Sequence, residues 1–175
     1  MNKSISVYIP TCNRPEMLDR ALASLLRQSY QNFQVLVCND GSRCSYREVI
    51  EKYRGQFVDF QYVENAYPRG ACFSRNRLIM LADGEYITGL DDDDEFMENR
   101  LENFLTSPFL QQYAFLATGH LTRTSRGVFR QPFQVGNVTL NAMCERNVVG
   151  NQVFTRTEYL RRCGGFDEDL SLIHI

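Results

Sequence analysis

The stretch YITGLDDDDEF, residues 86–96, joins an apolar, strand-like segment directly to four consecutive aspartates and a glutamate. Two like charges about 4 Å apart repel by roughly 1 kcal/mol in water and by about 4 kcal/mol at an effective dielectric near 20. A solvated turn tolerates this repulsion, and a charge run taken alone indicates such a turn. A half-buried strand end tolerates it only when some acids stay protonated or a cation binds. The choice therefore depends on where the remaining sequence places this run.

Strand-like and helix-like segments alternate along the first half of the chain. A buried strand is expected at residues 4–9, and further strands at 33–38, 58–63 and 85–90. Apolar residues recur at helical spacing after Pro15, and Asn13 is placed to cap that helix. Further helices are expected near 46–53 and within 65–84, where Leu81 belongs to the buried face. Such alternation predicts an α/β fold, with a mostly parallel, Rossmann-like central sheet flanked by helices.

The pattern becomes less regular after residue 97. A helix is expected at 98–105, strand-like pieces at 113–121 and 127–133, and a last strand and helix within 151–163. We interpret residues 1–175 as one compact domain. Residues 1–97 form its nucleotide-binding half, and residues 98–175 form an acceptor-side half that is expected to be incomplete.

Composition narrows the classes of function. The net charge of −2 and the scattered basic residues give no reason to expect nucleic-acid binding. The six cysteines form no C-x-x-C pair and no zinc pattern, so they are expected to be reduced thiols of a cytoplasmic protein. The first ten residues contain too short an apolar run for a signal sequence, and no apolar stretch approaches the length of a membrane span.

Three polar segments follow strands of the expected sheet: PTCNR at 10–14, NDGS at 39–42, and the acids at 91–95. The carboxyl ends of parallel strands form one edge, where ligands bind. No Walker A motif and no G-x-G-x-x-G motif is present, so a glycine-rich loop does not hold phosphates. Carboxylates that bind Mg²⁺ or Mn²⁺ are the other way to hold a diphosphate. The acids lack the glycine of an EF-hand loop, so they favour this second arrangement.

These motifs, in this order, resemble family 2 glycosyltransferases of the GT-A fold. The resemblance covers nearly the whole chain and rests on the segments SVYIPTCNR, QSYQNFQVLVCNDGS, RGACFSRNRLI, YITGLDDDDEF and GGFDE. It implies a metal-dependent enzyme that transfers a sugar from a nucleotide-diphosphate sugar, most simply a UDP-sugar, to an acceptor hydroxyl with inversion. The acceptor would be a saccharide or a lipid-linked sugar in cell-surface polysaccharide or glycolipid synthesis, which allows peripheral association with the inner face of the membrane.

The resemblance also implies roles for particular residues. The residues expected to contact the nucleotide-sugar are Pro10, Thr11, Arg14, Asp40, Ser42, Arg75, Asn76, Asp91 and Asp92. Among them, Pro10 and Thr11 would form the floor of the base and ribose pocket, and Asp40 would accept a hydrogen bond from the nucleobase edge. Asp93, together with Asp91, would hold Mn²⁺ or Mg²⁺. Taken alone, Asp40 followed by glycine would be read as a turn.

An inverting transfer needs a general base. In the family this base follows the GGFDE motif at a short distance, whereas this sequence continues DLSLIHI and stops, which indicates truncation or a foreign tail. Asp167 and Glu168 are the weak candidates for the base. Two alternatives follow: a nucleotide-sugar-binding fragment without transfer activity, and a sugar-phosphate nucleotidyltransferase. The absence of glycine in TCNRPE, after the first strand, counts against the nucleotidyltransferase.

Overall fold

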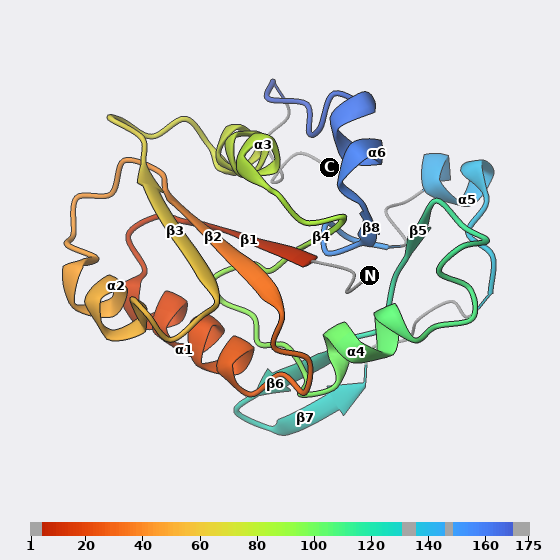
Figure 1. Cartoon of the computed structure of the whole chain (residues 1–175), viewed down its shortest axis with the longest axis horizontal. Helices are drawn as coiled ribbons and strands as arrows, with labels where there is room; N and C mark the ends of the chain where they lie inside the picture. The colour runs from red at the N-terminus through yellow and green to blue at the C-terminus, as the bar shows by residue number, and fades with distance from the viewer. Residues whose placement is uncertain (1–4, 131–135, 146–148, 170–175) are drawn as a thin grey trace.

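The computed structural model describes residues 5–130, 136–145 and 149–169, so the terminal segment 171–175 lies outside the described residues. A six-stranded sheet in the order β3-β2-β1-β4-β8-β5 forms its centre (Figure 1). The strands of this sheet are β1 Ile5–Thr11, β2 Phe33–Asn39, β3 Asp59–Glu64, β4 Tyr86–Gly89, β5 Phe115–Leu116 and β8 Phe154–Arg156. The first four strands along the chain are parallel to one another, and β8 is antiparallel to both β4 and β5.

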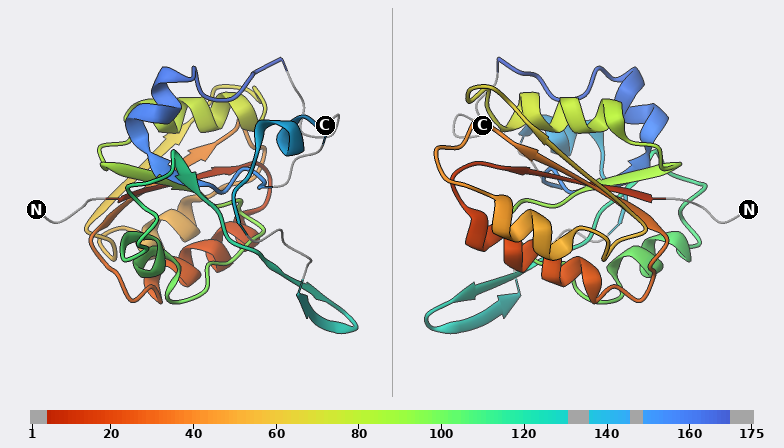
Figure 2. Two further views of the ribbon diagram at one scale, coloured as in Figure 1. Left: turned by 90° about the vertical axis from the view of Figure 1, so that its right-hand side faces the viewer. Right: turned by 60° about the vertical axis from the view of Figure 1, so that its left-hand side comes forward.

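Helices cover both faces of the sheet. They are α1 Pro15–Leu26, α2 Arg47–Tyr53, α3 Ala71–Leu81, α4 Arg100–Leu105, α5 Leu140–Glu145 and α6 Thr157–Arg162. Helices α1 and α2 lie on one face, and α3 and α6 lie on the other (Figures 1 and 2). A hairpin of β6, Leu121–Thr124, and β7, Gly127–Arg130, projects from the body of the molecule (Figure 2). No helix in the described ranges is long and apolar enough to cross a membrane.

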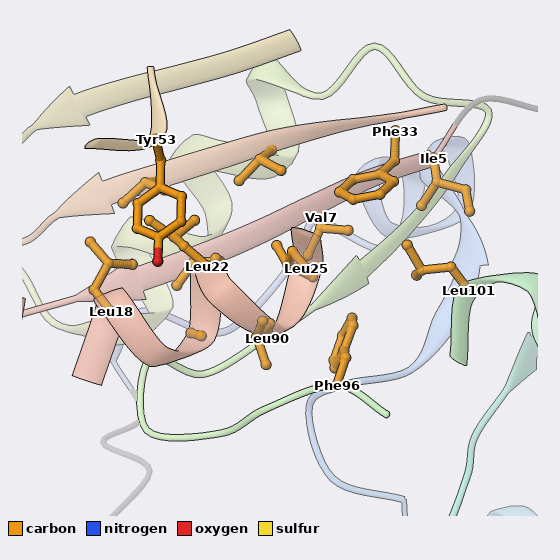
Figure 3. Packing of buried hydrophobic residues seen from close by; sticks show 14 of the residues in the cluster. Ile5, Val7, Leu18, Leu22, Leu25, Phe33, Tyr53, Leu90, Phe96 and Leu101 are labelled. Atoms are coloured by element: carbon orange, nitrogen blue, oxygen red, sulfur yellow. The ribbon is translucent and has the colours of Figure 1, made fainter. Parts of the chain in front are cut away.

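Two apolar clusters hold these layers together, because strands buried on both faces need apolar side chains in both directions. Ile5 and Val7 of β1 point toward α1 and α2, where they pack with the buried Leu18 and Leu22 (Figure 3). Ile9 belongs to the same cluster. Tyr8, between Val7 and Ile9 in β1, belongs to the second cluster, on the other face of the sheet. There Leu78 of α3 packs with Leu36 and Ile87 of the sheet. Burial of one such leucine contributes roughly 1.5–3 kcal/mol. The clusters therefore fix the sheet in position between the two helical layers.

The expected α/β order of the first half is confirmed, and two local expectations are wrong. Asn13 does not cap α1: it adopts a φ of +56°, and its side-chain oxygen accepts a hydrogen bond from the backbone N–H of Arg43 at 2.8 Å. Leu81 is 37% exposed at the last position of α3, where Leu78, Ile79 and Ala82 are the residues that join the cluster beneath the helix. The irregular second half completes the same sheet, since β8 pairs directly with β4.

Candidate donor-binding site

A cavity of about 220 Å³ opens at the carboxyl edge of the sheet, where β1, β2 and β4 end and α3 begins. The residues that line it are Pro10, Thr11, Cys12, Arg14, Asp40, Ala71, Arg75, Asp91, Asp92 and Asp93. Eight of these ten were candidates from the sequence. The parallel strands bring them together, because β1 lies between β2 and β4 in the sheet. Three members of the acidic run, Asp91, Asp92 and Asp93, are therefore part of the wall of a cavity.

Asp92 is the buried member of the run, with 1% of its surface exposed. Its Oδ2 accepts a hydrogen bond of 2.7 Å from the hydroxyl of Thr11, and its Oδ1 lies 2.6 Å from the guanidinium of Arg14. Burial raises the pKa of the Asp92 carboxyl, while the Thr11 hydrogen bond and the charge of Arg14 oppose that shift. The hydroxyl of Tyr46 completes this group, because it lies 2.8 Å from the Thr11 hydroxyl.

The neighbouring acids point toward different partners. Asp91 accepts hydrogen bonds from Arg75 at 2.7 Å and from the side-chain amide of Asn151 at 3.0 Å. The carboxylate of Asp93 is half exposed and forms an ion pair with Arg14 at 3.1 Å. Further along the run, Asp94 accepts a hydrogen bond from Gln152, and Glu95 pairs with Arg20 of α1 and with Arg27, the residue after that helix. A cationic or amide partner therefore offsets each negative charge, which a solvated turn would not require.

Arg75 is the basic residue most deeply placed at the cavity, with only 2% of its surface exposed. Its Nη2 donates to Asp91, but Nε and Nη1 have no hydrogen-bond partner among the residues that the structure describes. A buried guanidinium N–H without an acceptor costs about 1–3 kcal/mol. These two nitrogens, beside a cavity, are therefore suited to an oxygen-rich ligand.

Asp40 lines the cavity and also holds the segment that leads into α3. Its carboxylate accepts hydrogen bonds from the backbone N–H groups of Arg69 and Gly70, both at 2.8 Å, and from the side chain of Asn65 at 2.7 Å. The turn after Asp40 needs glycine: Gly41 has a φ of +59°, and an added Cβ would lie 2.3 Å from the carbonyl carbon of Tyr67. Asp40 thus has an architectural role that sequence analysis did not predict, and its contact with the nucleobase stays a prediction.

Four candidate residues do not line this cavity. Ser42 borders a larger, neighbouring hollow of about 870 Å³, where its hydroxyl accepts a hydrogen bond from the backbone N–H of Asn13 at 2.8 Å. Asn76 hydrogen-bonds to Phe166 and Glu168 instead. Asp167 and Glu168 are exposed and are absent from the lining. Their expected roles in donor binding or proton transfer therefore stay predictions.

Sequence reasoning missed the partners that the second half of the chain supplies. Asn151 and Gln152 reach Asp91 and Asp94 from the segment before β8, and Phe166 lies against Arg75. Asn151 and Gln152 stand in the stretch GNQVF, which carries no motif. The one signal that could have suggested them is the pair of adjacent amide side chains just before a strand of this sheet.

The carboxylates of the cavity suit a divalent cation whose coordination is completed by the phosphates of a bound ligand. Within the described ranges, no three His, Cys, Asp or Glu side chains gather as a ready metal site. Asp91 and Asp93 nevertheless both line the cavity with partly exposed carboxylates. Mg²⁺ typically uses one or two carboxylates together with substrate phosphates, so two acids are sufficient. The donor set consists of hard oxygens, which suits Mg²⁺ or Mn²⁺.

Replacement of Thr11 by valine is expected to lower the free energy of unfolding by about 1–3 kcal/mol, because the buried carboxylate of Asp92 loses a donor. Valine is favourable in a strand, so strand propensity should not contribute to the loss. Urea unfolding at pH 7 measures the change. Thr106→Val is the matched control, since that hydroxyl is exposed and donates only to the backbone carbonyl of Glu102. Equal losses in both variants would contradict this account of Asp92.

Comparison with known families defines the class of protein that this fold and cavity represent. Residues 6–134 match the family model for glycosyl transferase family 2, which is more than half of the chain. The chain therefore belongs to glycosyl transferase family 2, as its motifs predict. Membership in this family argues against the nucleotidyltransferase alternative.

Two relatives from Escherichia coli illustrate the similarity. WcaA of strain K12, which is named for colanic acid biosynthesis, is 38% identical over 178 residues that cover 97% of this chain and 62% of WcaA. WfgD, named as a UDP-Glc:alpha-D-GlcNAc-diphosphoundecaprenol beta-1,3-glucosyltransferase, is 28% identical over 112 residues that cover 64% of this chain and 44% of WfgD. The chain thus spans less than two thirds of either relative.

Solved structures confirm the predicted fold class. TarS 1–349 of S. aureus, in complex with UDP-GlcNAc, is 24% identical and superposes with a TM-score of 0.73 over 92% of this chain and 47% of TarS. The mannosyltransferase PcManGT of Pyrobaculum calidifontis, in complex with GDP-Man and Mn²⁺, is 18% identical, with a TM-score of 0.68 over 95% of this chain and 48% of PcManGT. At these identities the likeness concerns the fold alone.

Proposed function

We propose that this chain binds a nucleotide-diphosphate sugar in the 220 Å³ cavity, as the donor-binding part of a metal-dependent glycosyltransferase. The observation that carries the proposal is the composition of the cavity wall. A buried arginine with two unpaired nitrogens, Arg75, stands beside two partly exposed carboxylates, Asp91 and Asp93. Cationic groups and carboxylates at one edge of the sheet suit a ligand that combines phosphates, a metal ion and hydroxyl groups.

The family resemblance implies the proposed roles of the lining residues, and their position at one cavity supports them. Pro10 and Thr11 form the floor of the nucleoside pocket, and Asp40 accepts from the nucleobase edge. Asp91 and Asp92 lie nearest to ribose or sugar hydroxyls, and Asp93, with Asp91, holds Mn²⁺ or Mg²⁺.

The cation, when bound, supplies positive charge that offsets the diphosphate. Arg14 is half exposed at the cavity, and its Nη1 can exchange the carboxylate of Asp93 for a phosphate oxygen while its Nη2 stays 2.6 Å from Asp92. The protein therefore reorganises one surface ion pair when the ligand binds. Such a pair contributes only about 0–1 kcal/mol, so the exchange costs little.

The proposed reaction is transfer with inversion. The acceptor oxygen forms a bond to the anomeric carbon, the bond from that carbon to the diphosphate oxygen breaks, and the nucleotide diphosphate leaves with the electron pair. A general base takes the proton of the acceptor hydroxyl. Asp167 and Glu168 remain the candidates for this base. If neither acts, the chain as given binds donor without transferring sugar, which is the second candidate function.

The proposed donor is a UDP-sugar, and the proposed acceptor is a saccharide or lipid-linked sugar of cell-surface polysaccharide synthesis. The names of two relatives support this choice: WfgD is named for a UDP-Glc donor and a diphosphoundecaprenol-linked acceptor, and WcaA for colanic acid biosynthesis. A lipid-linked acceptor would bring the protein to the membrane surface, which makes peripheral association part of the proposal.

UDP is expected to bind at least about tenfold more tightly with Mn²⁺ or Mg²⁺ than in excess chelator, a difference of about 1.4 kcal/mol. The reason is that Asp91, Asp92 and Asp93 repel bare phosphates, whereas a cation between them and the diphosphate attracts both. Isothermal titration calorimetry of the whole chain measures the two affinities. Offering GDP and ADP in parallel identifies the preferred base. Equal affinity with and without chelator would contradict metal dependence, and no binding of any nucleotide diphosphate would overturn the proposed function.

A further inference from the structure

The side chain of Asn76 connects the GGFDE segment, residues 164–168, to helix α3 by hydrogen bonds. The side-chain amide nitrogen of Asn76 donates to the backbone carbonyl of Phe166 at 2.7 Å and to the carboxylate of Glu168 at 2.9 Å. Its side-chain oxygen accepts a hydrogen bond from the backbone N–H of Phe166 at 2.7 Å. Asn76 therefore satisfies both backbone groups of one residue that lies 90 positions away in the sequence.

The two glycines of the segment make this approach possible. Gly164 and Gly165 have φ angles of +82° and +75°, a region that favours glycine. A Cβ added to Gly165 would lie 2.3 Å from the side-chain oxygen of Asn76. Any other residue at position 165 would displace the backbone from Asn76. The sequence GGF is thus matched to the asparagine that it contacts.

The fastened segment places an aromatic ring against Arg75, which lines the donor cavity. The ring centroid of Phe166 lies 5.4 Å from the guanidinium carbon of Arg75, within the range of a cation–π contact. The same ring meets Tyr8 edge-on, with centroids 6.4 Å apart. On its other side, Arg75 donates to Asp91 at 2.7 Å. Arg75 is therefore held between Phe166 and Asp91, and its two unpaired nitrogens are left for a ligand.

We propose that Asn76 is a positioning residue: it holds segment 164–168 on α3 and, through the ring of Phe166, orients the guanidinium of Arg75 for the donor. The inference rests on the proposed function, from which the identity of the ligand of Arg75 is taken. It differs from the role that the family resemblance implies, because Asn76 does not line the cavity and all its side-chain hydrogen-bonding groups face segment 164–168. The acceptor-side half of the chain is thereby coupled to the donor site.

A double-mutant cycle tests whether Asn76 acts through Arg75. Asn76→Ala should weaken binding of UDP with Mn²⁺ by about tenfold, within the range found for residues coupled through a contact. Arg75→Lys keeps the charge beside Asp91 but removes the planar guanidinium, so it should weaken binding at least as much. In the Arg75→Lys background, Asn76→Ala should have no further effect. An undiminished effect of Asn76→Ala in that background would overturn the inference, as would unchanged affinity of either single variant.

Two control variants separate positioning from general loss of stability. Met80→Ala truncates an exposed side chain on the same helix, and Val35→Ala truncates a buried one in the opposite cluster. Both should keep the affinity of the parent for UDP, even though Val35→Ala lowers the melting temperature. Rescue provides a further readout: Asn76→Asp sets a carboxylate against Glu168, and adding Glu168→Gln should recover part of the lost affinity. If Val35→Ala weakened binding as much as Asn76→Ala, the positioning role would be rejected.

A measurement without nucleotide distinguishes failure of this inference from failure of the proposed function. The Nη2–H group of Arg75 is buried and hydrogen-bonded to Asp91 at 2.7 Å, so its NMR signal in the parent should be resolved and protected from exchange with water. Asn76→Ala should abolish that protection, and Met80→Ala should retain it. If the parent binds no nucleotide diphosphate but Asn76→Ala still releases Arg75, only the proposed function fails. If Arg75 keeps its protection in Asn76→Ala, the positioning role fails.

Discussion

Asp40→Ala is expected to lower the free energy of unfolding by about 3–5 kcal/mol, because the buried amide of Asn65 and two partly buried backbone N–H groups lose their acceptor. A fully buried donor without an acceptor costs about 1–3 kcal/mol, and the two partly buried groups are placed at the lower end of that range. For a domain of this size, 1 kcal/mol corresponds to roughly 2–4 °C in melting temperature, so a decrease of about 6–20 °C follows. Affinity for UDP should fall as well, because the segment that carries Asp40's partners leads directly into Ala71 at the cavity.

Chemical denaturation and thermal melting of the ligand-free protein measure this effect. Asp19→Ala is the matched control, since that aspartate makes a surface ion pair with Lys52 at 2.6 Å and should contribute only about 0–1 kcal/mol. Asp40→Asn should fall between the two, because the amide keeps one acceptor oxygen and sets an N–H₂ group against the remaining donors. If Asp40→Ala lost affinity for UDP but melted like the parent, Asp40 would serve the nucleobase alone and not the architecture of the loop.

Asp93→Asn is expected to remove most of the rise in melting temperature that Mn²⁺ and UDP together produce in the parent. A ligand that binds only the native state stabilises it by about 2.7 kcal/mol at a hundredfold excess over Kd. This corresponds to a rise of roughly 5–11 °C for the parent. Without ligand, the variant should melt within a few degrees of the parent, because Asp93 makes only a half-exposed ion pair with Arg14, worth about 0–1 kcal/mol.

Asp94→Asn is the matched control for Asp93→Asn. Asp94 belongs to the same acidic run and carries the same charge, but it accepts a hydrogen bond from Gln152 and does not line the cavity. The control should keep the full ligand-induced rise, measured by differential scanning fluorimetry with Mn²⁺, UDP, or both. An Asp93→Asn protein that gained as many degrees as the parent would show that Asp93 holds no metal.

The sequence by itself determined the architecture and the place of the site. The spacing of apolar residues, such as Ile5, Val7 and Leu22, predicts which face of a strand or helix is buried, because each element must present an apolar face to the core. Once the strands are known to be parallel, their carboxyl ends must meet at one edge. That rule alone brought Thr11, Asp40 and the acidic run to one cavity.

Only the tertiary structure decided what each of these side chains does. The four aspartates are identical in sequence, yet Asp92 is buried against Thr11, Asp93 is half exposed, and Asp91 faces Arg75. No local pattern encodes these directions, because the partners lie 16 to 81 positions away and depend on how the layers pack. The pairing of Asn76 with Phe166 across 90 residues arises in the same way. Periodicity reports which face of an element is buried, whereas hydrogen-bond partners are set by the chain segments that packing brings against that face.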